Sequence, residues 1–148
     1  MGVKKAIEKV KQFEYWDVIL TVIAVFVFYQ LLGIALGTSH PIDVVVSDSM
    51  LPDLRPGDLV VCAKSNPKVG DVVIYSGPRR YPIIHRVVGI NDSYCRKEIK
   101  QGGCYTIKGD NNPNLDPPVR EEQIMCVIQL HIPYLGYPRY IIYSFLGI

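Results

Sequence analysis

Residues 18–36, with the sequence VILTVIAVFVFYQLLGIAL, contain no charged side chain, and they decide how this chain is organised. A helix of this length extends about 28 Å at about 1.5 Å per residue, close to the hydrocarbon thickness of a bilayer. The alternatives are a buried helix and a cleavable signal sequence, but a signal sequence would have a shorter apolar run followed by a small-x-small site. The sequence therefore predicts one transmembrane helix over residues 15–37.

The charges on either side of this helix predict its orientation. Lysines stand at positions 4, 5, 9 and 11, whereas the first basic residue after the helix is Arg55. This asymmetry predicts that the basic residues 1–14 stay in the cytoplasm and that the chain after the helix is extracytoplasmic. A net charge of +2 is too small to indicate a nucleic-acid partner, and the basic end needs only anionic lipid.

After residue 37 the pattern changes to short apolar runs separated by Pro, Gly, Asn and Asp, which are turn formers. β-branched residues are frequent in these runs, and their close spacing leaves no room for alternating strands and helices. The sequence therefore predicts a mainly β fold, a small antiparallel β-rich catalytic domain over residues 38–132, preceded by the one N-terminal transmembrane α-helix. The predicted strands cover residues 42–46, 58–63, 71–75, 83–90, 105–108 and 124–131.

Four cysteines lie on the predicted extracytoplasmic side, where disulfides are permitted. Cys95 and Cys104 flank a polar, Gly-containing loop, and we expect a local disulfide between them. Cys62 and Cys126 stand inside apolar runs, where buried free thiols are an equally acceptable interpretation. No Cys or His spacing is typical of a zinc site, so we expect no metal and no other cofactor.

The last segment, residues 133–148, is aromatic and turn-rich, and its final apolar residues are too few to cross a bilayer. Three interpretations remain. The segment is an ordinary final strand or core segment, a membrane-proximal patch with Tyr at the headgroup level, or a truncated second membrane helix.

Serine hydrolysis needs a nucleophile, a base, a group that orients the base, and donors for the oxyanion. Candidate side chains for these roles occur in order along the chain. Ser47 and Ser49 follow a strand-like run, His85 stands inside a predicted strand, and Asp110 and Asp116 lie in the polar loop KGDNNPNLDPP. Each is weak evidence alone, because serines near Pro are mostly turn residues and a lone strand histidine is more often structural.

The combination is more specific. In chain order the sequence contains SDSMLP (47–52), GDVVIY (70–75), HRVVG (85–89) and GDNNPNLD (109–116). This order after one membrane helix resembles signal peptidase I, and the resemblance extends from about residue 15 to residue 137. The bacterial branch of that family carries a lysine where this chain carries His85, so the resemblance is to the archaeal and endoplasmic-reticulum type.

The resemblance implies a role for each candidate. Ser49 is the expected nucleophile, His85 its general base and Asp116 the acid that orients the base, with Asp110 as an accessory carboxylate. The order of the two aspartates stays open. The backbone N–H of Ser49 and the hydroxyl of Ser47 are the expected oxyanion donors. Asp48 stands where the family often has Gly; it either favours the turn or acts electrostatically on the histidine.

The function implied by the resemblance is a membrane-bound serine endopeptidase. Its substrates are the signal peptides of secreted and membrane preproteins, cut after a small-x-small site by an enzyme that binds the cleavage segment along an exposed strand edge. The expected partners are those preproteins, the lipid bilayer and the Sec translocon. The compact chain favours an archaeal plasma membrane over the endoplasmic reticulum.

Other interpretations stay open at this point. A serine/lysine protease would use Lys108 as its base. A catalytically inactive homologue would act as a binding subunit of a processing complex, although the intact Ser, His and Asp set disfavours it. A membrane-anchored adhesion domain would not require that set. Asn91-Asp92-Ser93 also matches an N-glycosylation acceptor.

Overall fold

A computed structural model describes residues 2–78 and 81–146 of the chain, with side chains described from residue 15 onward. The ends of the first and last predicted segments, Met1 and residues 147–148, lie outside the described residues, as do the side chains of the four N-terminal lysines. The chain divides into two units, with the boundary between Ala35 and Leu36.

The first unit is a single helix, α1 (Gly2–Leu36). It begins at Gly2 instead of residue 15, because residues 3–14 contain good helix formers such as Ala, Lys, Glu and Gln and no Gly or Pro. The span from Tyr15 to Leu36 has a mean hydropathy of 2.5, and none of its residues is buried. Within the described ranges it is the one helix long and apolar enough to cross a membrane.

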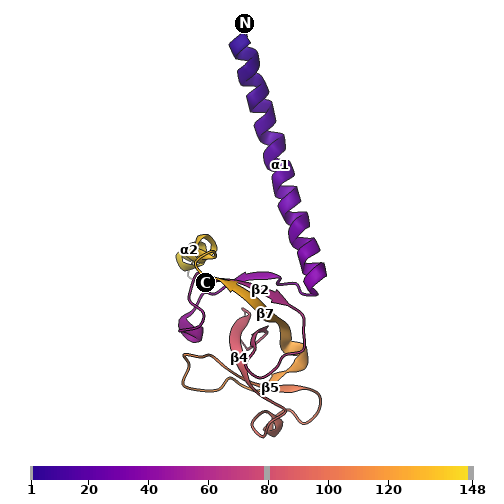
Figure 1. The fold of residues 1–148 in the computed structure, drawn as a ribbon, viewed down its shortest axis with the longest axis vertical. Helices are drawn as coiled ribbons and strands as arrows, with labels where there is room; N and C mark the ends of the chain where they lie inside the picture. The colour runs from indigo at the N-terminus through magenta and orange to yellow at the C-terminus, as the bar shows by residue number, and fades with distance from the viewer. Residues whose placement is uncertain (1, 79–80, 147–148) are drawn as a thin grey trace. The chain divides into compact units, whose positions relative to one another are not determined.

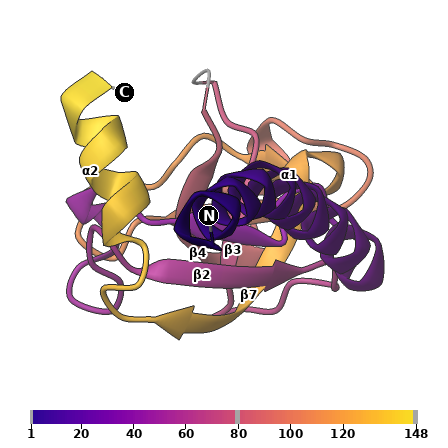
Figure 2. The ribbon, with the colours of Figure 1, turned by 90° about the horizontal axis from the view of Figure 1, so that it is seen from above.

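The second unit is built on one antiparallel sheet, as predicted (Figure 1). The strand order is β1-β2-β7-β3-β4-β5-β6, and the sheet curls into a half-barrel. The strands are β1 (Ile42–Val44), β2 (Leu59–Ala63), β3 (Val72–Tyr75), β4 (Ile83–Ile90), β5 (Cys104–Lys108), β6 (Val119–Arg120) and β7 (Ile124–Ile132). Figure 2 shows β2 running beside β7 along the lower edge of the view.

Alternation along the strands decides which side chains enter the core. In β2 the buried residues are Val60 and Cys62, and in β4 they are His85, Val87 and Gly89. The histidine of β4 therefore lies on the same face as core residues, as the period of two requires. Two buried clusters lie along the sheet, and a third, smaller one contains Cys95, Ile99 and Cys104. The first contains Val45, Met50, Leu54, Val60, Cys62, Ile74 and Cys126; the second contains Val73, Tyr75, Val87, Tyr105, Ile107, Val119 and Val127.

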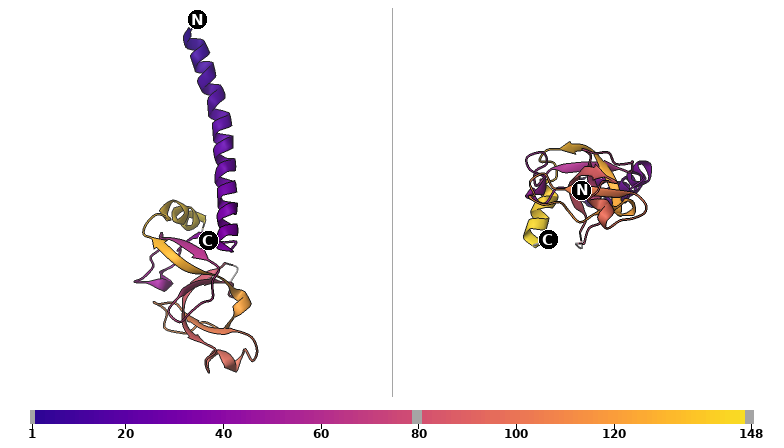
Figure 3. Two further views of the ribbon diagram at one scale, coloured as in Figure 1. Left: turned by 45° about the vertical axis from the view of Figure 1, so that its right-hand side comes forward. Right: turned by 90° about the horizontal axis from the view of Figure 1, so that it is seen from below.

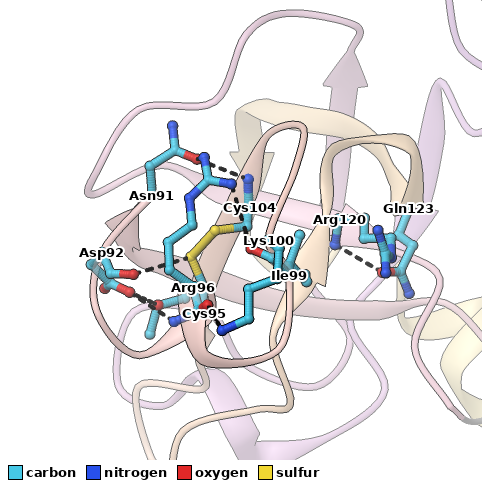
Figure 4. The surroundings of a disulfide bond; sticks show 10 residues. Asn91, Asp92, Cys95, Arg96, Ile99, Lys100, Cys104, Arg120 and Gln123 are labelled. Atoms are coloured by element: carbon cyan, nitrogen blue, oxygen red, sulfur yellow. Dashed lines mark hydrogen bonds between the residues drawn. A yellow bond between two sulfur atoms is a disulfide. The ribbon is translucent and has the colours of Figure 1, made fainter.

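Both cysteine pairs form disulfides. Cys62 and Cys126 are joined between the neighbouring strands β2 and β7, so they are not the free thiols that the sequence left open. Cys95 and Cys104 are joined at the end of the β4–β5 hairpin (Figure 4). The pairing of the first two could not be derived from spacing, because 64 residues separate them and only the sheet order makes them neighbours.

The β4–β5 hairpin is closed by side-chain hydrogen bonds around its disulfide (Figure 4). The Asn91 side-chain oxygen accepts from the Cys104 N–H at 3.1 Å and from the Arg96 guanidinium at 2.5 Å. Asp92 accepts from the Cys95 N–H at 3.0 Å and from the Thr106 hydroxyl at 2.8 Å. These two bonds, the backbone one first, lower the pKa of Asp92.

The C-terminal segment is a helix, α2 (Tyr137–Leu146), which begins beyond the end of β7 (Figure 3). None of its residues is buried, so the interpretation as a final strand or core segment is wrong. The turn before α2 is fastened to the chain around Gly57: the Tyr134 N–H donates to buried Asp58 at 3.1 Å. A Cβ on Gly57 would lie 2.4 Å from the Tyr137 ring, so this close approach requires glycine.

Candidate active site

Ser49 stands in a short 3-10 helix, Asp48–Met50, that follows β1. The next residue, Met50, is 1% exposed and packs in the first core cluster, whereas Ser49 is only partly buried. The buried methionine therefore fixes the turn on the domain and leaves the serine at the surface. The Ser49 hydroxyl oxygen lies 3.1 Å from that of Ser47, so the two predicted site serines are hydrogen-bonded.

His85 is 6% exposed on β4, and its Nδ1 lies 2.5 Å from Oδ2 of Asp116. A carboxylate can only accept hydrogen bonds, so Nδ1 carries the proton of this pair. In the neutral imidazole the other nitrogen, Nε2, is then unprotonated and able to accept a proton. The pair thus places a base-competent histidine beside its orienting carboxylate, the arrangement used by serine hydrolases.

Gly109 lies close to both the His85 ring and the Ser49 turn. A Cβ built on Gly109 would lie 2.8 Å from His85 Nε2 and 2.8 Å from the backbone oxygen of Ser49. These two atoms are therefore no more than twice that distance apart. The described structure contains no hydrogen bond between the Ser49 hydroxyl and His85, and such bonds are often loose before substrate binds.

The serine turn is held against this loop by Asn111. Its backbone N–H donates to the Ser49 carbonyl oxygen at 2.8 Å, and its side-chain amide donates to the Asp48 carbonyl oxygen at 3.1 Å. The structure shows that its bonds join the GDNN loop directly to the serine turn.

We expect Gly109→Ala to lower kcat at least about 100-fold, because a displacement of about 1 Å in an active site can have this effect. The added methyl group would press on both His85 and Ser49, and the position has no positive φ that would forbid alanine. Initial rates on a preprotein substrate and thermal melting measure the effect. Gly102→Ala is the control, since its Cβ meets open space. Alanine is strained at its φ of +79°, so we expect this variant to lose some stability but no activity.

Asp110 has a different partner from Asp116. Arg86 donates to the two oxygens of Asp110 at 2.9 and 2.6 Å, to Asp53 at 2.7 Å and to the Gly70 carbonyl oxygen at 2.8 Å. The hydrogen bond with Asp110 is the main reason that the pKa of Arg86 is raised. This network joins three loops next to His85, and it places Asp110 against an arginine instead of the histidine.

The remaining candidates also have defined positions. The Ser49 N–H belongs to the first turn of its 3-10 helix, where N–H groups lack partners within the helix. The Asp48 carboxylate is exposed and forms no hydrogen bond or ion pair with any described residue. Lys108 is the register partner of Arg86, so it stands on the opposite face of the sheet from His85. No group of three metal-ligating side chains occurs in the part of the chain that the structure describes.

The chain belongs to the class of serine-type peptidases, here on an antiparallel β half-barrel with one candidate membrane helix among the described residues. Within that class the chain belongs to the signal peptidase family, peptidase S26, whose model matches residues 14–99. It belongs to the endoplasmic-reticulum type of the family.

Yeast proteins are among its relatives. The signal peptidase complex catalytic subunit of Zygosaccharomyces rouxii is 35% identical over 124 residues, which cover 76% of this chain and 71% of the relative. The same subunits of Lachancea thermotolerans and Saccharomyces cerevisiae are 34% and 32% identical with the same coverage. These relatives give no support to the preference for an archaeal plasma membrane, which rested on the compactness of the chain.

Proposed function

We propose that this chain cleaves N-terminal signal peptides from preproteins with Ser49 as nucleophile, His85 as general base and Asp116 as the acid that orients His85. One observation carries the assignment. The Nδ1 of His85 bonds Asp116 at 2.5 Å, and both its other nitrogen and the Ser49 backbone oxygen lie 2.8 Å from the position that a Cβ on Gly109 would take. Membership of the signal peptidase family supports the reaction type.

In this mechanism Nε2 of His85 takes the hydroxyl proton of Ser49 as its oxygen attacks the scissile carbonyl carbon. Asp116 holds the ring in the required tautomer and stabilises the imidazolium that forms. The Ser49 N–H and the Ser47 hydroxyl donate to the oxyanion. The proton then passes to the leaving amine, and a water activated by the same histidine hydrolyses the acyl-enzyme.

The strand pairing supports binding of an extended substrate. Residues Ile83–His85 of β4 pair with β3 on one side, whereas pairing with β5 begins only at Arg86. The first half of β4 therefore has an edge without a β5 partner, directly beside the catalytic histidine. Ser47 is also extended, with φ −133° and ψ 163°. An unpaired edge can add a peptide strand through main-chain hydrogen bonds.

The test uses the full chain reconstituted in liposomes with a preprotein that has Ala at the first and third positions before the cut. We expect one new N-terminus directly after the small-x-small site, identified by mass spectrometry. A matched preprotein with Phe at the last position before the cut is expected to stay intact. Cleavage at another position, or equal cleavage of both preproteins, would contradict the proposal.

The two aspartates are expected to respond differently to removal of their charge. Asp116→Asn should lower kcat about 10⁴-fold, because it loses the orienting carboxylate and favours the wrong imidazole tautomer. Asp110→Asn should lower kcat less, about tenfold, and should lower the melting temperature, because it weakens the bidentate bond with Arg86. Kinetics and melting of both variants in parallel would show whether this order is reversed.

We also propose a single-pass topology, with residues 1–14 in the cytoplasm, residues 15–37 in the membrane and the β domain outside. Residues 37–41 connect α1 to β1, and an extended connection of this length spans only about 20 Å. The domain is therefore tethered close to the bilayer surface. The C-terminal helix α2 exposes Ile142, Phe145 and Leu146 at 60, 88 and 64%. We assign these side chains to the membrane interface, as their apolar exposure and the tether together favour.

Fluorescence tests this placement. Phe145→Trp in the full chain in liposomes is expected to be quenched by brominated lipid more strongly than wild type, in which Trp16 is the one tryptophan. Val69→Trp, at a 62% exposed loop position, is the control and should show no added quenching. No difference between the two variants would mean that α2 does not contact lipid.

Partners of this chain are proposed on the same basis. The yeast relatives are catalytic subunits of a signal peptidase complex, so we propose that this chain also acts within such a complex, at the site where the Sec translocon delivers preproteins. Ser49, His85 and Asp116 are all present, in the chain order of the family's motifs. Their presence favours the catalytic role over that of an inactive binding subunit.

A further inference from the structure

Tyr75 is the last residue of β3, and its position is determined by the register of that strand with β4. Val73 is the partner of His85, so Tyr75, two residues further on, lies diagonal to His85 on the same face. The two ring centroids are 6.5 Å apart. Tyr75 is 2% exposed, so its phenol is directed into the domain beside the histidine.

The Tyr75 hydroxyl donates a hydrogen bond of 2.9 Å to Oδ2 of Asp116. The same oxygen accepts the Nδ1–H of His85. One carboxylate oxygen thus receives two donors from adjacent strands. A phenylalanine would fill almost the same volume, but it could not donate to this oxygen, so packing alone does not account for a buried hydroxyl here.

Asp116 needs such a support because it stands outside the strands, in the loop between β5 and β6. Its main chain is held by the bond from its N–H to the Ile107 carbonyl oxygen at 2.9 Å, and by the Tyr94 hydroxyl, which donates to the Asp116 carbonyl oxygen at 3.2 Å. Neither bond fixes the carboxylate group. His85 and Tyr75 are the two side chains bonded to it in the described part of the chain.

We propose that Tyr75 is a positioning residue that holds the Asp116 carboxylate against His85. Tyr75 would then support Asp116, Asp116 would orient His85, and His85 would act on Ser49. This inference rests on the proposed function. Tyr75 touches neither substrate nor reacting atoms in this proposal; it acts through Asp116. It therefore affects the chemical step and not the binding of the preprotein.

Tyr75→Phe in the full chain tests the proposal. We expect kcat to fall about tenfold with KM changed by less than about twofold, since a transition-state interaction is lost and substrate contacts are kept. Tyr94→Phe is the matched control: it removes a second tyrosine hydroxyl bonded to the same residue, but at the backbone, and is expected to retain the wild-type kcat. Thermal melting of both variants checks that the fold is intact.

A double-mutant cycle separates positioning from a general structural effect. In an Asp116→Ala background, measured by single turnover with enzyme in excess, Tyr75→Phe is expected to change the rate by less than about twofold. An equal loss of rate in both backgrounds, a change confined to KM, or the same loss in Tyr94→Phe would overturn the proposal. If wild type does not cleave the preprotein, the proposed function fails; if wild type cleaves and Tyr75→Phe matches it, only this inference fails.

Discussion

Ser49→Ala is expected to lower kcat/KM for preprotein cleavage by at least about 10⁴-fold, because removal of a serine nucleophile ends covalent catalysis. The substitution removes one hydroxyl at the surface and leaves Met50 in the core, so the fold should be preserved. The variant should still bind preprotein. Its cleavage rate is measured by mass spectrometry and its stability by thermal melting.

Two serines serve as references for this result. Ser65→Ala, at an exposed loop position, is expected to match wild type. Ser47→Ala should lower kcat about 100-fold, as removal of one oxyanion donor does elsewhere. Wild-type cleavage by Ser49→Ala together with complete loss in Ser47→Ala would transfer the nucleophile to Ser47, since the two hydroxyls are only 3.1 Å apart.

His85→Ala is expected to have an effect of similar size, about 10⁴-fold on kcat, because the serine loses its base and Asp116 loses the group that it orients. In this variant the Asp116 carboxylate keeps its hydrogen bond with Tyr75. Thermal melting is measured alongside activity, to separate a loss of stability from a loss of catalysis. His131→Ala is the control, since His131 is exposed on β7 and is expected to retain activity.

His85→Lys distinguishes the base proposed here from the serine/lysine alternative. A lysine at this 6% exposed position would bring a positive charge next to Asp116, and we expect it to form an ion pair that is inactive as a base. Substantial activity in this variant would support a dyad mechanism. Wild-type activity in His85→Ala would remove the histidine from the mechanism altogether.

The strand pattern was readable because β2 and much of β4 alternate between buried and more exposed residues, and because turn formers separate the apolar runs. The strand predicted over residues 83–90 has the observed bounds, and the strand over residues 124–131 is one residue short. The two-residue strand β6 was missed because it directly follows Pro117-Pro118, which indicated a turn. For the C-terminal segment a helix was only one of three interpretations, because its aromatic residues and Pro138 are not typical of a helix interior, although Pro is well tolerated in a first turn.

The site was only partly readable from the sequence, because its electrostatic pairings depend on which loops the sheet brings together. Sequence could nominate two aspartates but could not assign them: Asp116 meets His85, whereas Asp110 meets Arg86. Tyr75 ends an apolar strand and the GDVVIY motif, but neither feature gave this residue a role. Its importance follows from a register that places it diagonal to His85.

The disulfide between Cys62 and Cys126 divides the proposed catalytic residues between two parts of the chain. It closes a covalent ring of chain that contains Tyr75, His85 and Asp116, while Ser49 lies on the open N-terminal arm. In the chain-entropy model, a ring of this size stabilises the fold by about 4 kcal/mol. A protease cut in the β4–β5 hairpin would leave Ser49 and His85 on the N-terminal fragment and Asp116 on the C-terminal one, and the two fragments would stay covalently joined until the disulfides that span the cut are reduced.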